Sequence, residues 1–123
     1  MIAIDTSSWV AYLSGAPGAD LDLVEQALTD RQACLLPVVL SELLSDPVLP
    51  RRLQALFLEL PLLPLIEGYW ERAGRLRARV LARRRKARLA DTLIAQSCLD
   101  HDVLLVSRDA DFRTFLREGL QLV

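Results

Sequence analysis

Four acidic side chains stand where predicted strands end or predicted helices begin, and together they could bind a divalent cation. Asp5 ends the first apolar run, and Asp109 lies just past a later one at 103–106. Asp91 lies in the first turn of the helix that leads into that later strand, and Glu42 lies early in the helix after another strand. In a parallel sheet all four reach the same edge, which is where open α/β sheets place their ligand sites.

The composition of this acidic set favours a hard metal ion. Converging carboxylates repel one another, and among the cations only Arg108 stands beside these acids in the sequence. A divalent cation would remove the repulsion, and ligand sets made only of oxygen favour Mg²⁺ or Mn²⁺. Such a site needs no histidine, and we expect the single His101, at a helix end, to be structural.

Each acid also has a purely structural alternative, because Asp is common at helix N-caps. Asp5, Asp91 and Asp109 could cap helices, and Asp111 could favour the dipole of the last helix. Glu42 is harder to explain in this way, since it lies within a helix on an apolar face, where a buried carboxylate would need a partner. Joint metal binding explains better why all four acids reach one edge.

Short apolar runs alternate with amphipathic segments along the whole chain, and this alternation positions the acids. We predict strands at 2–4, 33–36, 62–66, 103–106 and 120–123. We predict helices at 7–14, 20–30, 38–44, 51–60, 69–85, 90–101 and 110–117. The pattern indicates a single α/β domain over residues 1–123, with a parallel sheet covered on both faces by right-handed crossovers. Pro64 argues that the third strand lies at an edge of the sheet.

Composition excludes several classes of protein. The chain has 123 residues, enough for one full core, and 52% of them are hydrophobic, which argues against disorder. No apolar run approaches the roughly 20 residues of a membrane span, and Asp5 interrupts any signal-peptide core. Cys34 and Cys98 have neither metal-binding nor redox spacing, so we expect two reduced, buried thiols in a cytoplasmic protein.

Positive charge is concentrated in one segment, although the net charge is only −1. Residues 1–66 carry three Arg against eight acids, whereas residues 67–123 carry twelve Lys and Arg against eight acids. Five cations occur in the six residues Arg83–Arg88, with no acid among them. The alternative is a solvated helix tail, but the density of charge favours binding of phosphate groups.

The acidic motifs, taken in order, resemble those of PIN-domain nucleases, specifically the VapC-like toxins of bacterial toxin–antitoxin pairs. The similar segments are MIAIDTSSW at the start, LSELL around Glu42, LADTLIAQSC around Asp91 and LLVSRDADF around Asp109. Together they span nearly the whole chain. One departure concerns the residues before Asp91, where many relatives have a glycine and an apolar pair and this chain has Arg85-Lys86-Ala87-Arg88-Leu89. This difference predicts a more basic rim to the site.

The resemblance implies a PIN-like fold, with a five-stranded parallel sheet in the order 3-2-1-4-5, and a set of site residues. It gives metal-binding and catalytic roles to Asp5, Glu42, Asp91 and Asp109. Thr6 and Ser107 match positions whose hydroxyls support those acids, and Asp111 matches an acid just outside the metal ligands. The cations expected to hold RNA through phosphate contacts are Arg83, Arg84, Arg85, Lys86, Arg88 and Arg108.

The activity implied by the resemblance is that of an endoribonuclease in which Mg²⁺ or Mn²⁺ activates water to attack a phosphodiester. The implied partners are an RNA substrate, a small cognate antitoxin and a second copy of the chain. A housekeeping RNA-maturation nuclease and a PIN-like binding module without catalysis remain alternatives. A receiver domain does not fit, because the first strand ends in a single Asp and no Lys follows the last strand.

Overall fold

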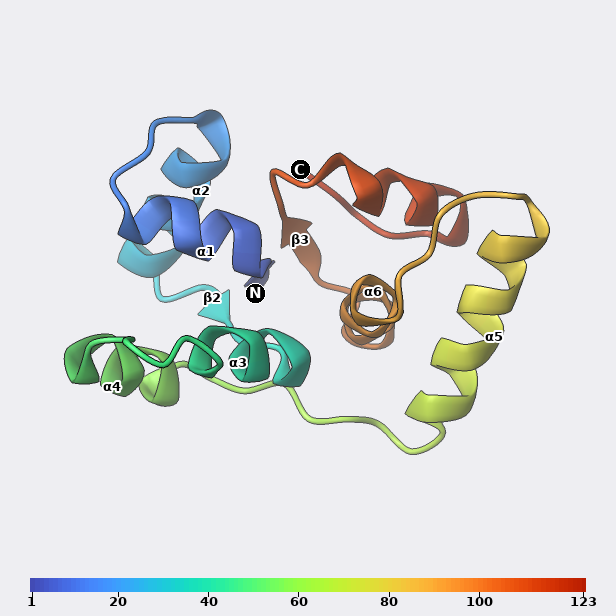
Figure 1. Ribbon diagram of the computed structural model, residues 1–123, viewed down its shortest axis with the longest axis horizontal. Coiled ribbons are helices and arrows are strands. Elements are labelled where there is room, and N and C mark those ends of the chain that lie inside the picture. Colours follow the sequence, from blue (N-terminus) through green and yellow to red (C-terminus); the bar gives the residue numbers. More distant parts are fainter.

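A computed structural model describes all 123 residues and has a short parallel sheet at its centre (Figure 1). Its strands are β1 (Ile2–Ile4), β2 (Ala33–Cys34) and β3 (Leu104–Val106). They lie in the order β2-β1-β3, with Ala3 opposite Cys34 on one side and Leu105 on the other. The predicted α/β architecture with a parallel sheet is confirmed.

The five-stranded sheet expected from the resemblance is only partly present. The segments at 62–66 and 120–123 each reach the sheet through a single parallel bridge, Leu35 with Leu62 and Leu105 with Leu122. Both lie at the edges where the order 3-2-1-4-5 would place them, but neither forms a strand. Pro61 precedes the first bridge and has no N–H to donate, so it cannot extend the ladder on that side, while the carbonyl of Pro64 is directed at His101 instead of the sheet.

The helices follow the predicted series with two differences. Their bounds are α1 Thr6–Leu13, α2 Ala19–Thr29, α3 Pro37–Leu44, α4 Arg51–Glu59, α5 Tyr69–Ala82, α6 Leu89–His101 and η1 Ala110–Glu118. First, α5 ends at Ala82 rather than Arg85, because Arg84 adopts a left-handed φ of 58°, through which a right-handed helix cannot continue. Second, η1 is a 3₁₀-helix rather than an α-helix.

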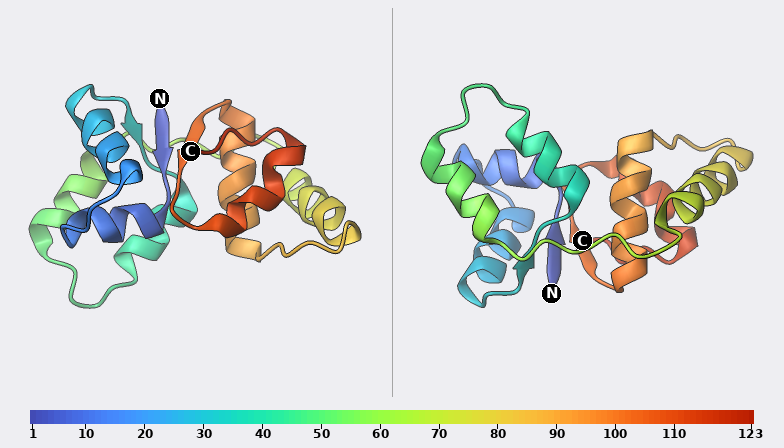
Figure 2. Two further views of the ribbon diagram at one scale, coloured as in Figure 1. Left: turned by 90° about the horizontal axis from the view of Figure 1, so that it is seen from above. Right: turned by 90° about the horizontal axis from the view of Figure 1, so that it is seen from below.

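Helix α6 holds the central position between the sheet and the outer helix α5. Helices α1 and α2 lie on one side of the sheet and α3 and α6 on the other (Figure 1), while α5 packs against α6 on the side away from the strands (Figure 2). Six of the thirteen residues of α6 are buried, including the polar residues Thr92, Gln96 and Ser97. Packing from two sides fixes the N-terminal end of α6, which carries Asp91.

The core anchors the two other segments that carry acids. Trp9 of α1 is fully buried and meets Phe57 of α4 edge-on, with ring centroids 5.3 Å apart. Phe112 and Phe115 anchor η1 from its buried face. The backbone around Asp5 and Asp109 is therefore held by aromatic packing as well as by the strands.

The remaining compositional predictions concern the cysteines, the histidine and membrane spans. Cys34 and Cys98 are buried and form no disulfide, and burial raises the pKa of the Cys34 thiol to about 11. The Nε2 atom of His101 lies 2.8 Å from the carbonyl oxygen of Pro64, a contact at the end of α6 that suits a structural role. None of the helices combines the length and apolarity that crossing a membrane requires.

Candidate metal centre and its basic border

Ser107 links two of the predicted acids at the end of the sheet. Asp5 follows β1 and is almost completely buried, while Asp109 begins η1. The Ser107 hydroxyl donates to Asp5 Oδ2 at 2.9 Å and accepts from the backbone N–H of Asp109 at 3.0 Å. The Ser7 hydroxyl donates to the same Asp5 oxygen at 2.7 Å. This network fixes the Asp5 carboxylate and the start of η1 relative to each other.

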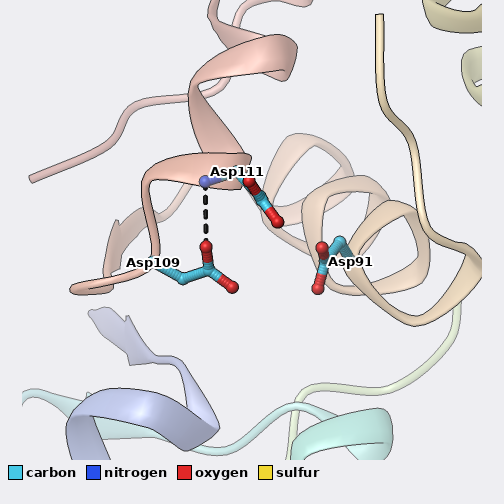
Figure 3. A group of neighbouring side chains, drawn as sticks. All are labelled: Asp91, Asp109 and Asp111. Atoms are coloured by element: carbon cyan, nitrogen blue, oxygen red, sulfur yellow. Dashed lines mark hydrogen bonds between the residues drawn. The ribbon is translucent and has the colours of Figure 1, made fainter.

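Three carboxylates converge in the space between α6 and η1 (Figure 3). One ligand oxygen from each of Asp91, Asp109 and Asp111 lies within 4.8 Å of those of the other two. Asp109 uses Oδ1 to accept the backbone N–H of Asp111 at 2.9 Å. Asp111, which we expected outside the metal ligands, thus belongs to the cluster itself.

The capping alternatives are realised for two of the acids without accounting for the cluster. Asp5 caps α1 through the Ser7 N–H, and Asp109 caps η1. Asp91 is not a cap, because the N-cap position of α6 is Arg88. The Asp91 carboxylate makes no hydrogen bond and no ion pair, so no structural role of that kind explains its position.

The pKa of Asp91 also reflects how close the carboxylates lie to one another. Burial raises the pKa of Asp91 to about 6, and the charges of Asp109, Asp5 and Asp111 add to the rise. Arg88 opposes it weakly. A hydrogen bond from Lys86 lowers the pKa of Asp111, whose carboxylate lies 2.9 Å from the Lys86 ammonium. Asp91 is therefore the acid that would gain most from a bound cation.

Glu42 lies apart from this cluster. Its side chain is exposed, and its Oε1 accepts the Thr6 hydroxyl at 2.7 Å. Glu42 is also absent from the charges that raise the pKa of Asp91. Our reason for expecting a cation beside Glu42, a buried carboxylate on an apolar face, was therefore wrong, because the Glu42 side chain is exposed and already has a hydrogen-bond partner in Thr6.

The predicted phosphate-binding cations differ in whether they already have a partner within the protein. Arg84, Arg85 and Arg88 are exposed and form no ion pair. Arg83 donates to the carbonyl of Thr114 at 3.2 Å. Arg108 is directed toward α2, where it donates to both carboxylate oxygens of Asp20 at 3.0 Å.

Comparisons with known proteins place this arrangement in a family. The model of the PIN domain matches residues 2–116. The chain belongs to the PIN domain family. No curated protein sequence matches it.

Solved structures with this PIN fold cover almost the whole chain. A FitAB complex bound to an IR36 DNA fragment aligns over 100% of this chain and 94% of its own, with a TM-score of 0.78 and 18% identity. FitAcB from Neisseria gonorrhoeae aligns over 99% and 96%, with a TM-score of 0.76 and 18% identity. VapBC2 from Rickettsia felis, bound to a promoter DNA fragment, aligns over 100% and 98%, with a TM-score of 0.77 and 20% identity. At these identities the likeness concerns the fold.

The donor set of this PIN domain is compatible with a divalent cation. All three clustered side chains offer carboxylate oxygens, and neither cysteine nor histidine belongs to the cluster. Oxygen donors of this kind suit Mg²⁺ or Mn²⁺ rather than Zn²⁺. The Asp91 carboxylate, without a partner and with its pKa raised, is the donor that most needs such an ion.

Two cations of the PIN domain escaped the sequence analysis. Arg113 and Arg117 lie on the exposed side of η1, four residues apart, and face the same cleft as Arg83, Arg85 and Lys86. Their positions between and after the apolar Phe112 and Phe115 could have predicted that both arginines lie on the exposed side of this helix, because the phenylalanines face the core.

Proposed function

We propose that this PIN domain is an endoribonuclease that depends on Mg²⁺ or Mn²⁺ and serves as the toxin of a VapBC-type toxin–antitoxin pair. The observation that carries the proposal is the convergence of Asp91, Asp109 and Asp111 within 4.8 Å, with a basic segment at its border. The family membership supports nuclease chemistry, and the motifs quoted above support the toxin assignment. RNA is the proposed substrate.

Asp91 and Asp109 are the proposed core of the metal site, with Asp5 beside them. A bound divalent ion would lower the pKa of water and stabilise charge on the phosphodiester oxygens. Ser107 orients the Asp5 carboxylate by donating a hydrogen bond to it, and it positions the start of η1. Lys86 holds Asp111 at one side of the cluster. Attack of water on phosphorus with departure of the 3′ oxygen would leave a 5′ phosphate and a 3′ hydroxyl.

Glu42 keeps a proposed role as a fourth acid on the strength of the sequence resemblance. The hydrogen bond from Thr6 holds its carboxylate on the α3 side of the site. Because Glu42 does not contribute to the electrostatics of Asp91, we expect Glu42→Gln to slow cleavage by about tenfold, against complete loss for substitution of Asp91. Steady-state cleavage of a labelled RNA by the two variants measures this difference. Equal losses would place Glu42 on the metal.

The nuclease assignment predicts defined products. Purified protein incubated with a mixed RNA pool and Mg²⁺ should yield fragments with 5′ phosphates, and EDTA should abolish them. Sequencing of the cut ends after ligation that requires a 5′ phosphate measures both the chemistry and the site preference. Fragments that accumulate equally in EDTA, or that carry 2′,3′-cyclic phosphates, would contradict metal-dependent hydrolysis.

A housekeeping role in RNA maturation is the second candidate, because the same site would serve it. The surface features that favour a toxin are two apolar grooves beside Glu42, of about 340 and 260 Å³, which offer a restraining partner a place to bind. Expression in cells with and without that partner separates the two roles.

A further inference from the structure

A cleft of about 360 Å³ opens beside the acidic cluster, between η1 and the segment that joins α5 to α6. Five of its eight lining residues are cationic, and they come from two parts of the chain. These five are Arg83, Arg85, Lys86, Arg113 and Arg117. The fold thus gathers onto one concave surface positive charges that lie up to 34 residues apart in sequence.

Most of this positive charge has no partner within the protein. Lys86 pairs with Asp111 at 2.9 Å, and Arg83 lies 3.6 Å from Glu118, which Arg79 already approaches at 2.7 Å. The other three cleft cations make no ion pair and no side-chain hydrogen bond, and all are exposed; they are Arg85, Arg113 and Arg117. Like charges in one cleft repel one another, and a bound anion would relieve this repulsion.

The rest of the lining indicates what kind of anion would bind. Ala110 is the only hydrophobic residue in it, and it contains no aromatic side chain on which a base could stack. Thr114 contributes a hydroxyl that is buried and has no hydrogen-bond partner. Because that hydroxyl oxygen is shielded from solvent, the exposed cations of the lining are the groups that an anion in the cleft would meet. The lining therefore suits phosphate groups and offers little to bases or to apolar peptide side chains.

The cleft is continuous with the acidic cluster, because Asp111 belongs to both and Lys86 contacts it from the cleft side. We propose that the cleft binds the sugar–phosphate backbone of a single-stranded nucleic acid next to the phosphate that is cut, with Arg113 and Arg117 as direct phosphate contacts. This rests on the proposed nuclease function. It also implies that the cleft does not read sequence or distinguish RNA from DNA, since neither bases nor 2′-hydroxyls are addressed.

The test measures binding without cleavage. Fluorescence anisotropy in EDTA would follow oligouridylate and oligothymidylate of about 12 nucleotides over a range of salt concentrations. For Arg113→Gln combined with Arg117→Gln, we expect the slope of log K against log salt to flatten by about two, or about one for each lost phosphate contact. RNA and DNA should lose affinity alike. The control is Arg75→Gln, an exposed arginine on α5 outside the cleft, which should leave the slope unchanged.

Two further measurements separate lost binding from lost folding. The melting temperature of the double variant without RNA should be unchanged or higher, because two repelling charges are removed. Arg113→Lys with Arg117→Lys should retain most of the salt slope, since the charges remain. A wild-type slope in the Gln variant would overturn the proposal. Competition by an oligoglutamate peptide more effective than by either oligonucleotide would also overturn it and make the cleft a surface for an acidic protein.

Binding and cleavage measurements can contradict the cleft proposal and the nuclease proposal independently of each other. An Asp91→Asn protein should bind both oligonucleotides with the wild-type slope. If the wild-type protein binds with an arginine-dependent slope yet never cuts RNA, the nuclease proposal fails and the phosphate cleft stands. If Asp91→Asn abolishes cutting while the arginine variants bind normally, the cleft proposal alone fails.

Discussion

Replacing Asp91 with Asn should abolish RNA cleavage and, in the absence of metal at neutral pH, raise the melting temperature of the protein. Both effects have one cause. Burial together with the charges of Asp109, Asp5 and Asp111 makes the ionised Asp91 carboxylate unfavourable, and its pKa is raised to about 6. Asn keeps the shape of the side chain and removes the charge, so it relieves the repulsion and removes a metal ligand.

The stability effect has a defined pH dependence. Because the pKa of Asp91 is higher in the folded protein, about 6, than in the unfolded chain, about 3.9, the favourable contribution of its proton is complete below about pH 4. That contribution is lost as the pH rises through about 6. The advantage of Asp91→Asn over the wild type should therefore be absent near pH 3 and grow to its full size by about pH 7.

The size of the expected gain in stability follows from the raised pKa of Asp91, and it is reduced because the side chain is partly exposed to solvent. The rise of the Asp91 pKa to about 6 corresponds to about 3 kcal/mol at most. Asp91 is only partly buried, so solvent screening should reduce the gain to about 1 kcal/mol, or about 4 °C in melting temperature. Thermal unfolding in EDTA at several pH values measures it. Mg²⁺ should then raise the melting temperature of the wild type more than that of the variant.

Asp22→Asn is the matched control, because Asp22 also lies in the first turn of a helix, α2, but is exposed and outside the acidic cluster. When an acid only complements a helix dipole, its neutralisation lowers the stability of the protein by a few tenths of a kcal/mol. The control should therefore be slightly destabilised and should cut RNA normally. If Asp91→Asn behaves like Asp22→Asn in both assays, Asp91 is not part of a metal site.

The parts of this fold that the sequence predicted are those set by local pattern. Strands β1 and β3 end just before Asp5 and near Asp109 because apolar runs stop there, and the first turn of α6 carries Asp91. Because the carboxyl ends of parallel strands meet at one edge of the sheet, these acids could be predicted to lie together before any distance between them was known. Asp111 was expected just outside the metal ligands, and sequence spacing alone does not show how near the first turn of η1 brings its carboxylate to those of Asp91 and Asp109.

The features that could not be predicted depend on contacts between distant segments. Arg108 stands beside Asp109 in sequence, yet it pairs with Asp20, 88 residues away, and its charge is directed to α2. Glu42 follows apolar residues at helical spacing, and Val39 on that face is buried, yet the Glu42 side chain itself is exposed and accepts a hydrogen bond from Thr6 of α1. Arg113 and Arg117 join the basic run only because η1 packs beside α5 and α6.

Expression of this protein alone should slow bacterial growth, and co-expression with the small open reading frame adjacent to its gene should restore it. A nuclease with an exposed acidic site would harm its own cell unless a partner covered that site. Two apolar grooves flank Glu42, one lined by Val38, Leu65 and Trp70, the other by Val10 and Leu13 among others. Trp70 is 62% exposed and Val10 is 56% exposed, so both are free to contact a partner.

The expected partner is a disordered segment that folds onto these grooves, with apolar anchors and one or more Arg. An Arg reaching Glu42 or the Asp91 cluster would form charge-assisted pairs and occupy the position of the metal. Such a complex should co-purify and show little ribonuclease activity.

Variants of the PIN domain test this arrangement. Asp91→Asn should abolish growth inhibition without weakening the apolar contacts. Trp70→Ala should weaken the complex by about tenfold and restore part of the toxicity under co-expression, as a contact of about 1.4 kcal/mol would. Leu58→Ala, at an exposed apolar residue of α4 outside both grooves, is the control and should change neither. If the wild-type protein is harmless when expressed alone yet cuts RNA in vitro, the toxin assignment is wrong, and a role in RNA maturation takes its place, because such an enzyme needs no restraining partner.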